Sequence, residues 1–351
     1  NNLFGNLTPL GLVFLAACKG TATSTIIANS TGKVEDGPLH NAIAFLDYNG
    51  DGELDNGEPW ERTGLDGSYS LTPTQAVYSI VAVTDDITID TVSGSVVSGM
   101  TLKAPSGSSM VTPTTTLMEV SGLTAEQVVK VLGLPVGMDP LTFSAHAVGV
   151  DPDNALTVEK ANQQVLAVVN SFAAAAEGSG VSETAAFSVA LTSLAEVIKA
   201  EANKATIVEL DLSDAAALAA IKTKTVTKVS DLSIYDSNIK SDEFAAIMTD
   251  TVKAAGFLNA KIRAISDTDL KSSATKDILS ISQILKEQVN EAAKATVVNN
   301  ANNSVNDAIT SADVAFASDS STALADAIAN KAPTDITLNT IYNSEALGHS
   351  S

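Results

Sequence analysis

Residues 42–59 read AIAFLDYNGDGELDNGEP, and this stretch decides how the N-terminal part of the chain folds. Residues 47–58 match the pattern D-x-[DN]-x-[DN]-G-x5-E at every specified position, which is the signature of an EF-type calcium loop. Ca²⁺ prefers about six to eight oxygen ligands, and alternate side chains of such a loop converge on one point as the chain curls. The expected metal ligands are the side chains of Asp47, Asn49, Asp51, Asp55 and Glu58 and the backbone carbonyl of Glu53.

The segments beside the loop predict strands, because residues 42–46 are apolar throughout and Pro59 follows the last ligand. A signalling EF-hand would need a helix on each side, so we expect an EF-type loop between strands that stabilises its domain. Gly52 permits the sharp turn, and Leu54 is expected to pack the loop onto the core. The alternative interpretation is an acidic turn that holds no metal. Asp66 begins a second turn, where it is either a plain turn residue or an additional ligand.

Strand patterns continue from residue 31 to about residue 113. Residues 77–83 form a β-branched run, and Ile87, Ile89 and Thr91 alternate after it. Gly, Ser, Asp and Pro interrupt these runs at short intervals, as in a small β-sandwich. We therefore assign residues 31–113 to a calcium-binding β-sandwich.

Helical patterns dominate residues 114–332. Thr124 and Gln127 form a capping box that opens a helix ending near Gly133, and residues 135–154 read as a connecting loop. Four apolar stripes then show the spacing of one buried helix face. Their members are Val165, Val168, Val169 and Phe172, then Phe187, Leu191, Leu194 and Ile198, then Phe244, Ile247, Met248, Thr251 and Val252, then Ile278, Ile281, Leu285 and Val289.

Shorter helices are expected over residues 213–226, 304–317 and 320–331. Together these patterns predict an Ala-rich bundle of about six to eight helices. The predicted fold class is therefore α+β and multidomain, with a β-sandwich followed by an α-helical bundle. A chain of 351 residues has room for both.

The two ends of the chain are expected to link neighbouring copies. Residues 1–30 contain the apolar run LGLVFLAAC at positions 10–18, which is too short to span a bilayer because a spanning helix needs about 20 residues. We interpret this run as a core segment or as a strand that inserts into a neighbouring subunit. Its end fits the lipobox of a bacterial lipoprotein, with the lipid on Cys18, but no Lys or Arg precedes it as in a signal peptide. Residues 333–351 are expected to form a C-terminal strand and linker.

The composition excludes several classes of function. The chain has 20 Lys and Arg residues against 41 Asp and Glu residues, which gives a formal net charge of −21. Such an acidic surface repels nucleic-acid phosphates and anionic membranes and favours divalent cations. The single cysteine excludes an internal disulfide, and the three widely spaced histidines argue against a transition-metal site.

The sequence contains no nucleophile elbow, P-loop, dinucleotide-binding fingerprint or zinc-protease motif, so we expect no enzymatic activity. Asp85 and Asp86 are interpreted as solvated turn residues rather than a catalytic pair. Trp60 is expected to be a packing residue rather than a sugar-binding platform. His146 is interpreted as an ordinary loop histidine.

The pattern from Gly37 through the loop at 47–58 to Tyr69 resembles the B-type repeats of Gram-positive serine–aspartate adhesins and the related collagen-adhesin B-type domains. The resemblance covers about residues 31–110 and is most specific at the loop. It implies a Ca²⁺-stabilised, extracellular β-sandwich of the prealbumin-like type.

Residues 100–117 and their Ala-rich continuation look like a module of large secreted surface proteins of Gram-negative bacteria. Residues 332–338 are similar to the opening strand of cadherin-like repeats, which implies that the chain is a segment of a larger protein. We therefore expect a secreted, non-enzymatic structural protein of the bacterial cell surface, either an adhesin or a subunit of a surface layer or filament. Its expected partners are further copies of itself and a glycan or cell-surface ligand. The alternative is a polysaccharide-binding module.

Overall fold

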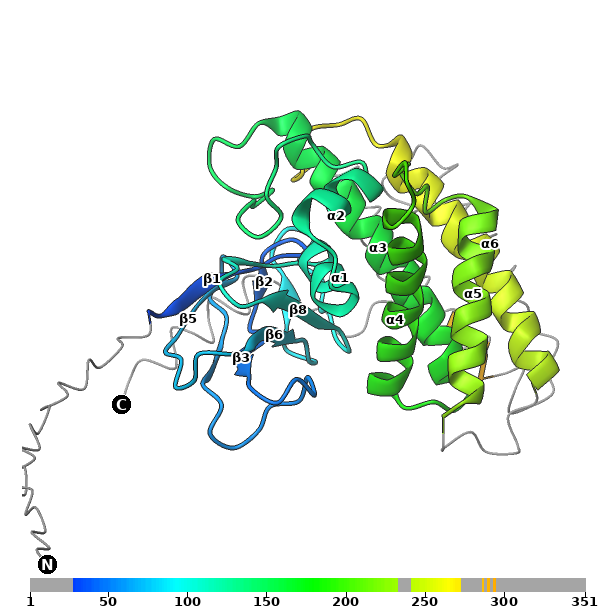
Figure 1. Ribbon diagram of the computed structural model, residues 1–351, viewed down its shortest axis with the longest axis horizontal. Helices are drawn as coiled ribbons and strands as arrows, with labels where there is room; N and C mark the ends of the chain where they lie inside the picture. The colour runs from blue at the N-terminus through cyan, green and yellow to red at the C-terminus, as the bar shows by residue number, and fades with distance from the viewer. Residues whose placement is uncertain (1–27, 233–240, 273–285, 287–288, 291–292, 295–351) are drawn as a thin grey trace, which may run out of the picture.

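The computed structural model describes residues 28–232, 241–272, 286, 289–290 and 293–294. A region of short strands, called here the β region (residues 30–111), comes first and is followed by helices that pack on one side of it (Figure 1). The prediction of an α+β chain with a β region followed by packed helices is confirmed. The expectations for residues 1–27 with Cys18, and for residues 333–351, lie outside the described residues.

The β region consists of three small sheets, which are mainly antiparallel. The four-stranded sheet has the order β4 (Trp60–Arg62), β3 (Ile43–Asp47), β6 (Ser79–Val83) and β8 (Thr101–Pro105). The three-stranded sheet has the order β5 (Ser68–Leu71), β1 (Ser30–Val34) and β9 (Met110–Val111). The third sheet pairs β2 (Leu39–His40) with β7 (Ile89–Asp90). The pairing of β1 with β9 is parallel, and all the others are antiparallel.

Strand β3 lies inside the four-stranded sheet and explains why residues 42–46 carry so few polar side chains. It pairs with β4 on one side and with β6 on the other, and Ala44, Phe45 and Leu46 are fully buried. A strand buried on both faces reads as a continuous apolar run rather than as an alternating one. The strand expected at 77–83 is β6, which begins two residues later, at Ser79.

Six named helices follow within the described residues. They are α1 (Pro113–Ser121), α2 (Ala125–Val131), α3 (Pro152–Gly178), α4 (Glu183–Ala202), α5 (Ala215–Ser230) and α6 (Ser241–Ala264). The capping box that was predicted at Thr124 and Gln127 is present. The loop expected over 135–154 is shorter, because Asp151 caps α3 and Pro152 begins it, a position that suits proline.

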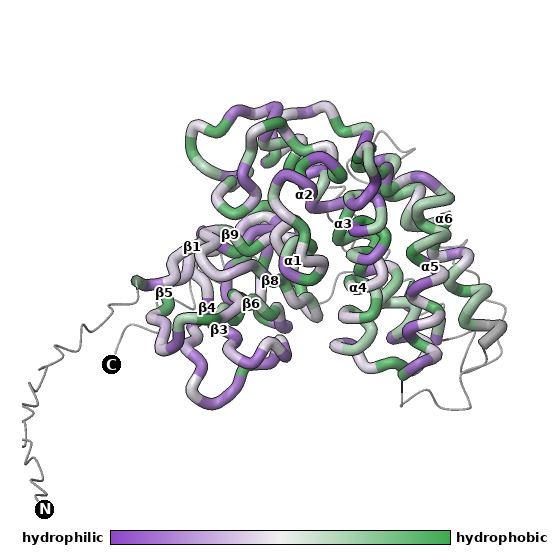
Figure 2. The backbone as a smooth tube through the Cα atoms, in the orientation of Figure 1, coloured by the Kyte–Doolittle hydropathy of each residue, from purple (hydrophilic) through white to green (hydrophobic). Residues whose placement is uncertain are grey.

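The apolar stripes mark the buried faces of the helices, as predicted. The stripes from Val165 and from Phe187 are buried along α3 and α4, and the stripe from Phe244 is buried along α6 except for the half-buried Val252. In Figure 2 hydrophobic and hydrophilic segments alternate along α5 and α6, as expected of helices with one buried face. Of the fourth stripe only Val289 is described, and it is buried. The helices expected at 304–317 and 320–331 lie outside the described residues.

Helix α1 was not expected, because its sequence PTTTLMEVS has three threonines directly after Pro113, and threonine is a weak helix former. Thr112 supplies the missing stability by capping the helix. Its hydroxyl accepts a hydrogen bond from the Thr115 backbone N–H, while the Thr115 hydroxyl accepts one from the Thr112 N–H. Thr115 and Thr116 also bond the backbone of Lys103 in β8, so α1 is attached to the edge of the four-stranded sheet.

Replacing Thr112 with Ala is expected to lower the free energy of unfolding by about 1 kcal/mol, because the first turn of α1 loses its side-chain cap. Ser182→Ala is the matched control. Ser182 occupies the same position before α4 but makes no side-chain cap hydrogen bond, so its loss should cost less. Urea unfolding of both variants measures the difference. Equal losses would contradict the role of Thr112.

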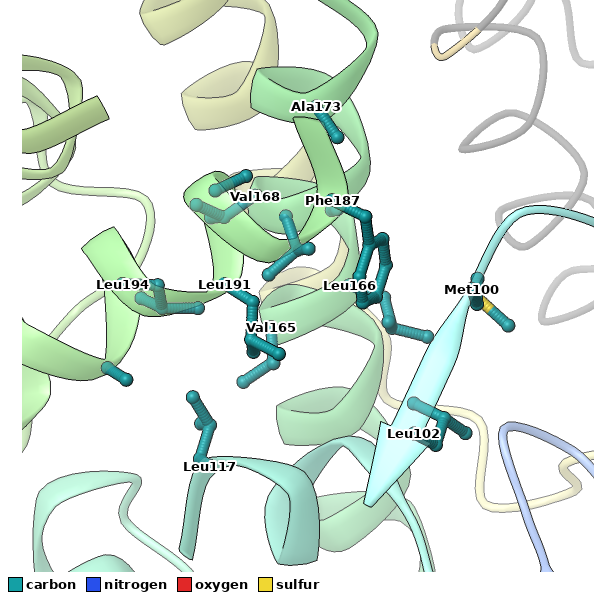
Figure 3. Close-up of a cluster of buried hydrophobic side chains, with 14 of the residues drawn as sticks. Met100, Leu102, Leu117, Val165, Leu166, Val168, Ala173, Phe187, Leu191 and Leu194 are labelled. Atoms are coloured by element: carbon teal, nitrogen blue, oxygen red, sulfur yellow. The ribbon is translucent and has the colours of Figure 1, made fainter. Parts of the chain in front are cut away.

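The β region and the helices share one hydrophobic core. In Figure 3 side chains from β8 and the residue before it, from α1, from α3 and from α4 gather in one cluster. Those labelled include Met100, Leu102, Leu117, Val165, Leu166, Phe187, Leu191 and Leu194. Helix α1 therefore lies between the sheet and the longer helices and joins them (Figure 1). Among the described residues no helix is long and apolar enough to cross a membrane.

Candidate metal centre

The predicted calcium loop connects β3 to β4. The two strands are antiparallel, with Phe45 opposite Trp60, so residues 48–59 form the loop of a β-hairpin. The predicted position of this loop between two strands is confirmed, and its binding of calcium stays a prediction. Gly52 has a φ of 81°, a left-handed conformation that side chains rarely adopt, and this is the turn for which the pattern requires glycine.

Asp47 and Glu58 close the loop at its two ends, and both are buried, at 1% and 8% exposed. The Asp47 carboxylate accepts hydrogen bonds from the backbone N–H groups of Gly50, at 2.6 Å, and Gly52, at 2.9 Å. The Glu58 carboxylate accepts from the N–H groups of Tyr48, at 2.8 Å, and Asp55, at 2.9 Å. These bonds fold the chain around the first and last residues of the motif.

Asn49, Asp51 and Asp55 converge on the exposed side of the loop. Nδ2 of Asn49 lies 2.7 Å from an Asp51 carboxylate oxygen and 2.9 Å from an Asp55 carboxylate oxygen. One amide group therefore bridges two carboxylates of the loop. The Asp51 carboxylate also accepts the Glu53 N–H at 2.8 Å, so the loop curls as the motif requires.

The residues present fit Ca²⁺ in their chemistry, because the loop offers carboxylate, amide and backbone oxygens and no softer ligand. Their side chains are nevertheless engaged with one another and with the backbone. Among the described residues no group of three or more His, Cys, Asp or Glu side chains is arranged to hold a metal ion. Binding would therefore require Asn49, Asp51 and Asp55 to exchange their mutual hydrogen bonds for the ion.

Two side chains near the loop differ from what the sequence indicated. Leu54, expected to pack onto the core, is 39% exposed, like the other residues of the exposed segment 53–57. Trp60, expected to be a packing residue, is 56% exposed on the short strand β4. Both predictions were wrong, since an apolar residue beside a buried strand does not have to face inward.

Two lysines of the β region lie near acidic groups. A Cβ atom added to Gly52 would come within 2.7 Å of Lys103 Nζ, which places a positive charge beside the acidic loop. Lys33 Nζ lies 2.9 Å from the Asp66 carboxylate. A hydrogen bond from Ser68, together with the Lys33 ammonium group, lowers the pKa of Asp66 to about 2. This pairing supports the plain-turn interpretation of Asp66 over the additional-ligand interpretation.

A second group of ionisable residues was missed at the sequence level. His146, interpreted as an ordinary loop histidine, has a buried side chain whose Nε2 lies 3.4 Å from a Glu159 carboxylate oxygen. Glu35, Asp36 and Asp90 are buried nearby. No motif joins these residues, because they come from distant parts of the chain. One signal in the sequence was Glu159 itself, a charged residue on a helix that is largely buried.

Comparisons of the chain with protein-family models, with curated proteins and with solved structures found no match. The resemblance of residues 31–110 to adhesin B-type domains therefore stays a prediction from the residues of the chain.

Proposed function

We propose that the chain is a non-enzymatic, extracellular structural protein of the bacterial cell surface, stabilised by Ca²⁺. The observation that carries the proposal is the loop at 47–58. It matches the calcium pattern throughout, joins two strands instead of two helices, and already brings Asn49, Asp51 and Asp55 together. A loop in this position ties β3 to β4, which is a stabilising role rather than a signalling one.

In the Ca²⁺-bound protein, the side chains of the predicted ligands and the Glu53 carbonyl would hold the ion. Ca²⁺ supplies charge neutralisation, which removes the repulsion among the carboxylates of one short loop. Asp47 and Glu58 position the loop through the backbone bonds they accept. The small antiparallel sheets are compatible with the finer proposal of a prealbumin-like sandwich, which the resemblance to adhesin B-type domains supports.

The overall charge supports an exterior location. A formal net charge of −21 keeps copies apart in solution and is best tolerated where divalent cations are abundant. We propose that the protein functions as an adhesin or as a subunit of a surface layer or filament. Its copies would associate through the terminal segments, residues 1–30 and 333–351. The apolar run at 10–18 supports the first of these.

Deletion of residues 1–20 is expected to abolish assembly and leave a folded monomer, because the apolar run would no longer reach a neighbouring copy. Electron microscopy and light scattering in Ca²⁺ measure assembly, and circular dichroism checks the fold. Deletion of residues 333–351 is the companion variant that tests the other end. Polymers that are unchanged by both deletions would contradict assembly through the termini.

A polysaccharide-binding module is the second candidate, and the exposure of Trp60 on β4 favours it. An exposed indole ring offers a flat face on which a sugar ring can stack. The two functions separate in the same experiment, because such a module would stay monomeric with both termini intact. It would also bind glycans on an array.

A further inference from the structure

A buried cluster of ionisable groups joins the β region to helix α3. Glu35 and Asp36 directly follow β1, Asp90 ends β7, His146 lies in the loop before α3, and Glu159 lies in α3. All four carboxylic residues are at least nine-tenths buried. The cluster thus places four acids and one histidine at the contact between two parts of the fold.

Hydrogen bonds connect the cluster across this contact. Gln163 of α3 donates from one amide nitrogen to Asp36 of the β region, at 2.6 Å, and to Glu159, at 3.0 Å. The hydroxyl of Ser144, in the loop before α3, donates to Glu35 at 2.6 Å. Asp90 lies against the turn that follows Asp36, because a Cβ atom added to Gly37 would come within 2.1 Å of its carboxylate.

The positive charge near the cluster is insufficient for its acids. Among the described residues, Lys33 acts on Glu35 besides His146, but it lies at the edge, is partly exposed and also pairs with Asp66. A further histidine, His40, is buried on β2, the strand that pairs with β7. Four carboxylates held close together away from water cannot all be ionised at low cost, because burial and mutual repulsion both favour the neutral form. Some of these acids must therefore bind protons when the contact is formed.

The pKa values follow from this environment. Burial, with the charge of Glu159, raises the pKa of Asp36 well above its usual value. Burial also raises the pKa of Asp90 to about 6, and it raises the pKa of Glu35. Burial opposes the charged form of His146, but the hydrogen bond and charge of Glu159 outweigh it and raise the pKa. Glu159 remains ionised, because His146 and Gln163 outweigh its burial and lower its pKa.

We propose that these residues form a proton-dependent latch between the β region and helix α3, which is closed when Glu35, Asp36 and Asp90 hold protons and loosens as these protons are released. The latch comprises Glu35, Asp36, Asp90, His146 and Glu159 with the bridging amide of Gln163. Because it lies where the β region meets α3, its release would weaken the contact between the two parts. The latch contains no residue of the calcium loop, which connects β3 to β4.

The sign of the pH dependence follows from linkage. Groups whose pKa is raised by folding stabilise the folded state fully below their unfolded pKa, and this stability is lost as the pH rises through the folded pKa. The loss of stability begins above the ordinary pKa of each group in the unfolded chain. This is about pH 4 for the Asp and Glu residues with raised pKa and about pH 6.5 for His146. Glu159, whose pKa is lowered, is ionised in both states above pH 5 and contributes no slope there. Stability should therefore fall as the pH rises from 5 to 7.5.

Equilibrium unfolding of the full chain in urea, at several pH values from 5 to 7.5 with a chelator present, tests the latch. If the folded state binds one proton more than the unfolded state, the equilibrium constant for folding falls about tenfold for each unit by which the pH rises. In Asp36→Asn the amide replaces the protonated carboxyl and still accepts from Gln163. The dependence of its stability on pH should therefore be weaker than that of the wild type. Glu126→Gln, an exposed acid paired with Lys130, is the control and should keep the wild-type slope.

Hydrogen exchange locates the effect, with rates corrected for the intrinsic dependence on pH. Wild-type amides near residues 33–37 and 156–164 should lose protection between pH 5 and 7.5 more than those of α5 do. If Asp36→Asn fails to fold, the hydrogen-exchange measurement on the wild type still tests the proposal. Equal slopes in wild type and Asp36→Asn, or a loss of protection that is uniform over the chain, would overturn the proposal.

Discussion

Chelation of Ca²⁺ is expected to lower the melting temperature of the wild-type chain by about 5–10 °C. A ligand present at about a hundred times its dissociation constant stabilises the folded state by about 2.7 kcal/mol, and this is lost with the metal. The physical reason lies in the loop. Without the ion, the carboxylates of Asp51 and Asp55 are held together only by the amide of Asn49.

Asp51→Ala is the informative variant for this prediction. Asp47 and Glu58 would be poor choices, because both are buried and accept backbone hydrogen bonds that the fold needs with or without metal. Asp51 is exposed, and most of its predicted role is to bind the ion. The melting temperature of Asp51→Ala should therefore not change on chelation.

Glu53→Ala is the matched control. Glu53 is a neighbouring, exposed acid whose expected contribution is its backbone carbonyl, so truncating its side chain should leave the effect of chelation intact. Differential scanning calorimetry with and without chelator measures all three proteins. If the wild type shows no change on chelation, the loop is an acidic turn that holds no metal.

Phe172→Ala is expected to lower the free energy of unfolding by about 3–5 kcal/mol, which is the largest effect of a single substitution predicted for this chain. Phe172 lies in α3, which packs against α4 and α6, and its side chain is fully buried. Truncation removes apolar contacts and leaves a cavity in a core that the neighbouring helices cannot easily close. Val136→Ala, at a fully exposed loop position, should cost less than about 0.5 kcal/mol.

The same variant tests whether the core is continuous. Trp60, the single tryptophan, reports on the β region, while far-ultraviolet circular dichroism reports mainly on the helices. The side chains of β8 and α1 pack with those of α3 and α4 (Figure 3). The unfolding midpoints that the two signals report should therefore move to lower urea concentration by the same amount. A helical transition that shifts alone would contradict a shared core.

The sequence predicted those features that depend on local pattern. Val165, Val168, Val169 and Phe172 share one face of α3 because a helix repeats every 3.6 residues, and periodicity is visible without knowing the fold. The loop at 47–58 was recognised because its polar side chains belong to one short segment and their spacing is set by the turn. Both predictions needed no knowledge of distant contacts.

The features that the sequence did not predict depend on tertiary packing. Helix α1 forms from threonines because Thr112 caps it and β8 holds it, and neither contact is a local propensity. His146 is buried because Glu159 lies beside it in the folded chain, thirteen residues further on. Trp60 is exposed because β4 is a short edge strand, which its own sequence does not reveal.

The central claim, that the chain is stabilised by Ca²⁺ at the loop between β3 and β4, is tested most directly by counting bound ions. Equilibrium dialysis at millimolar Ca²⁺ should find about one specifically bound ion per wild-type chain and per Glu53→Ala chain, and none per Asp51→Ala chain. No specific binding to the wild type, or the same binding to Asp51→Ala, would contradict the account.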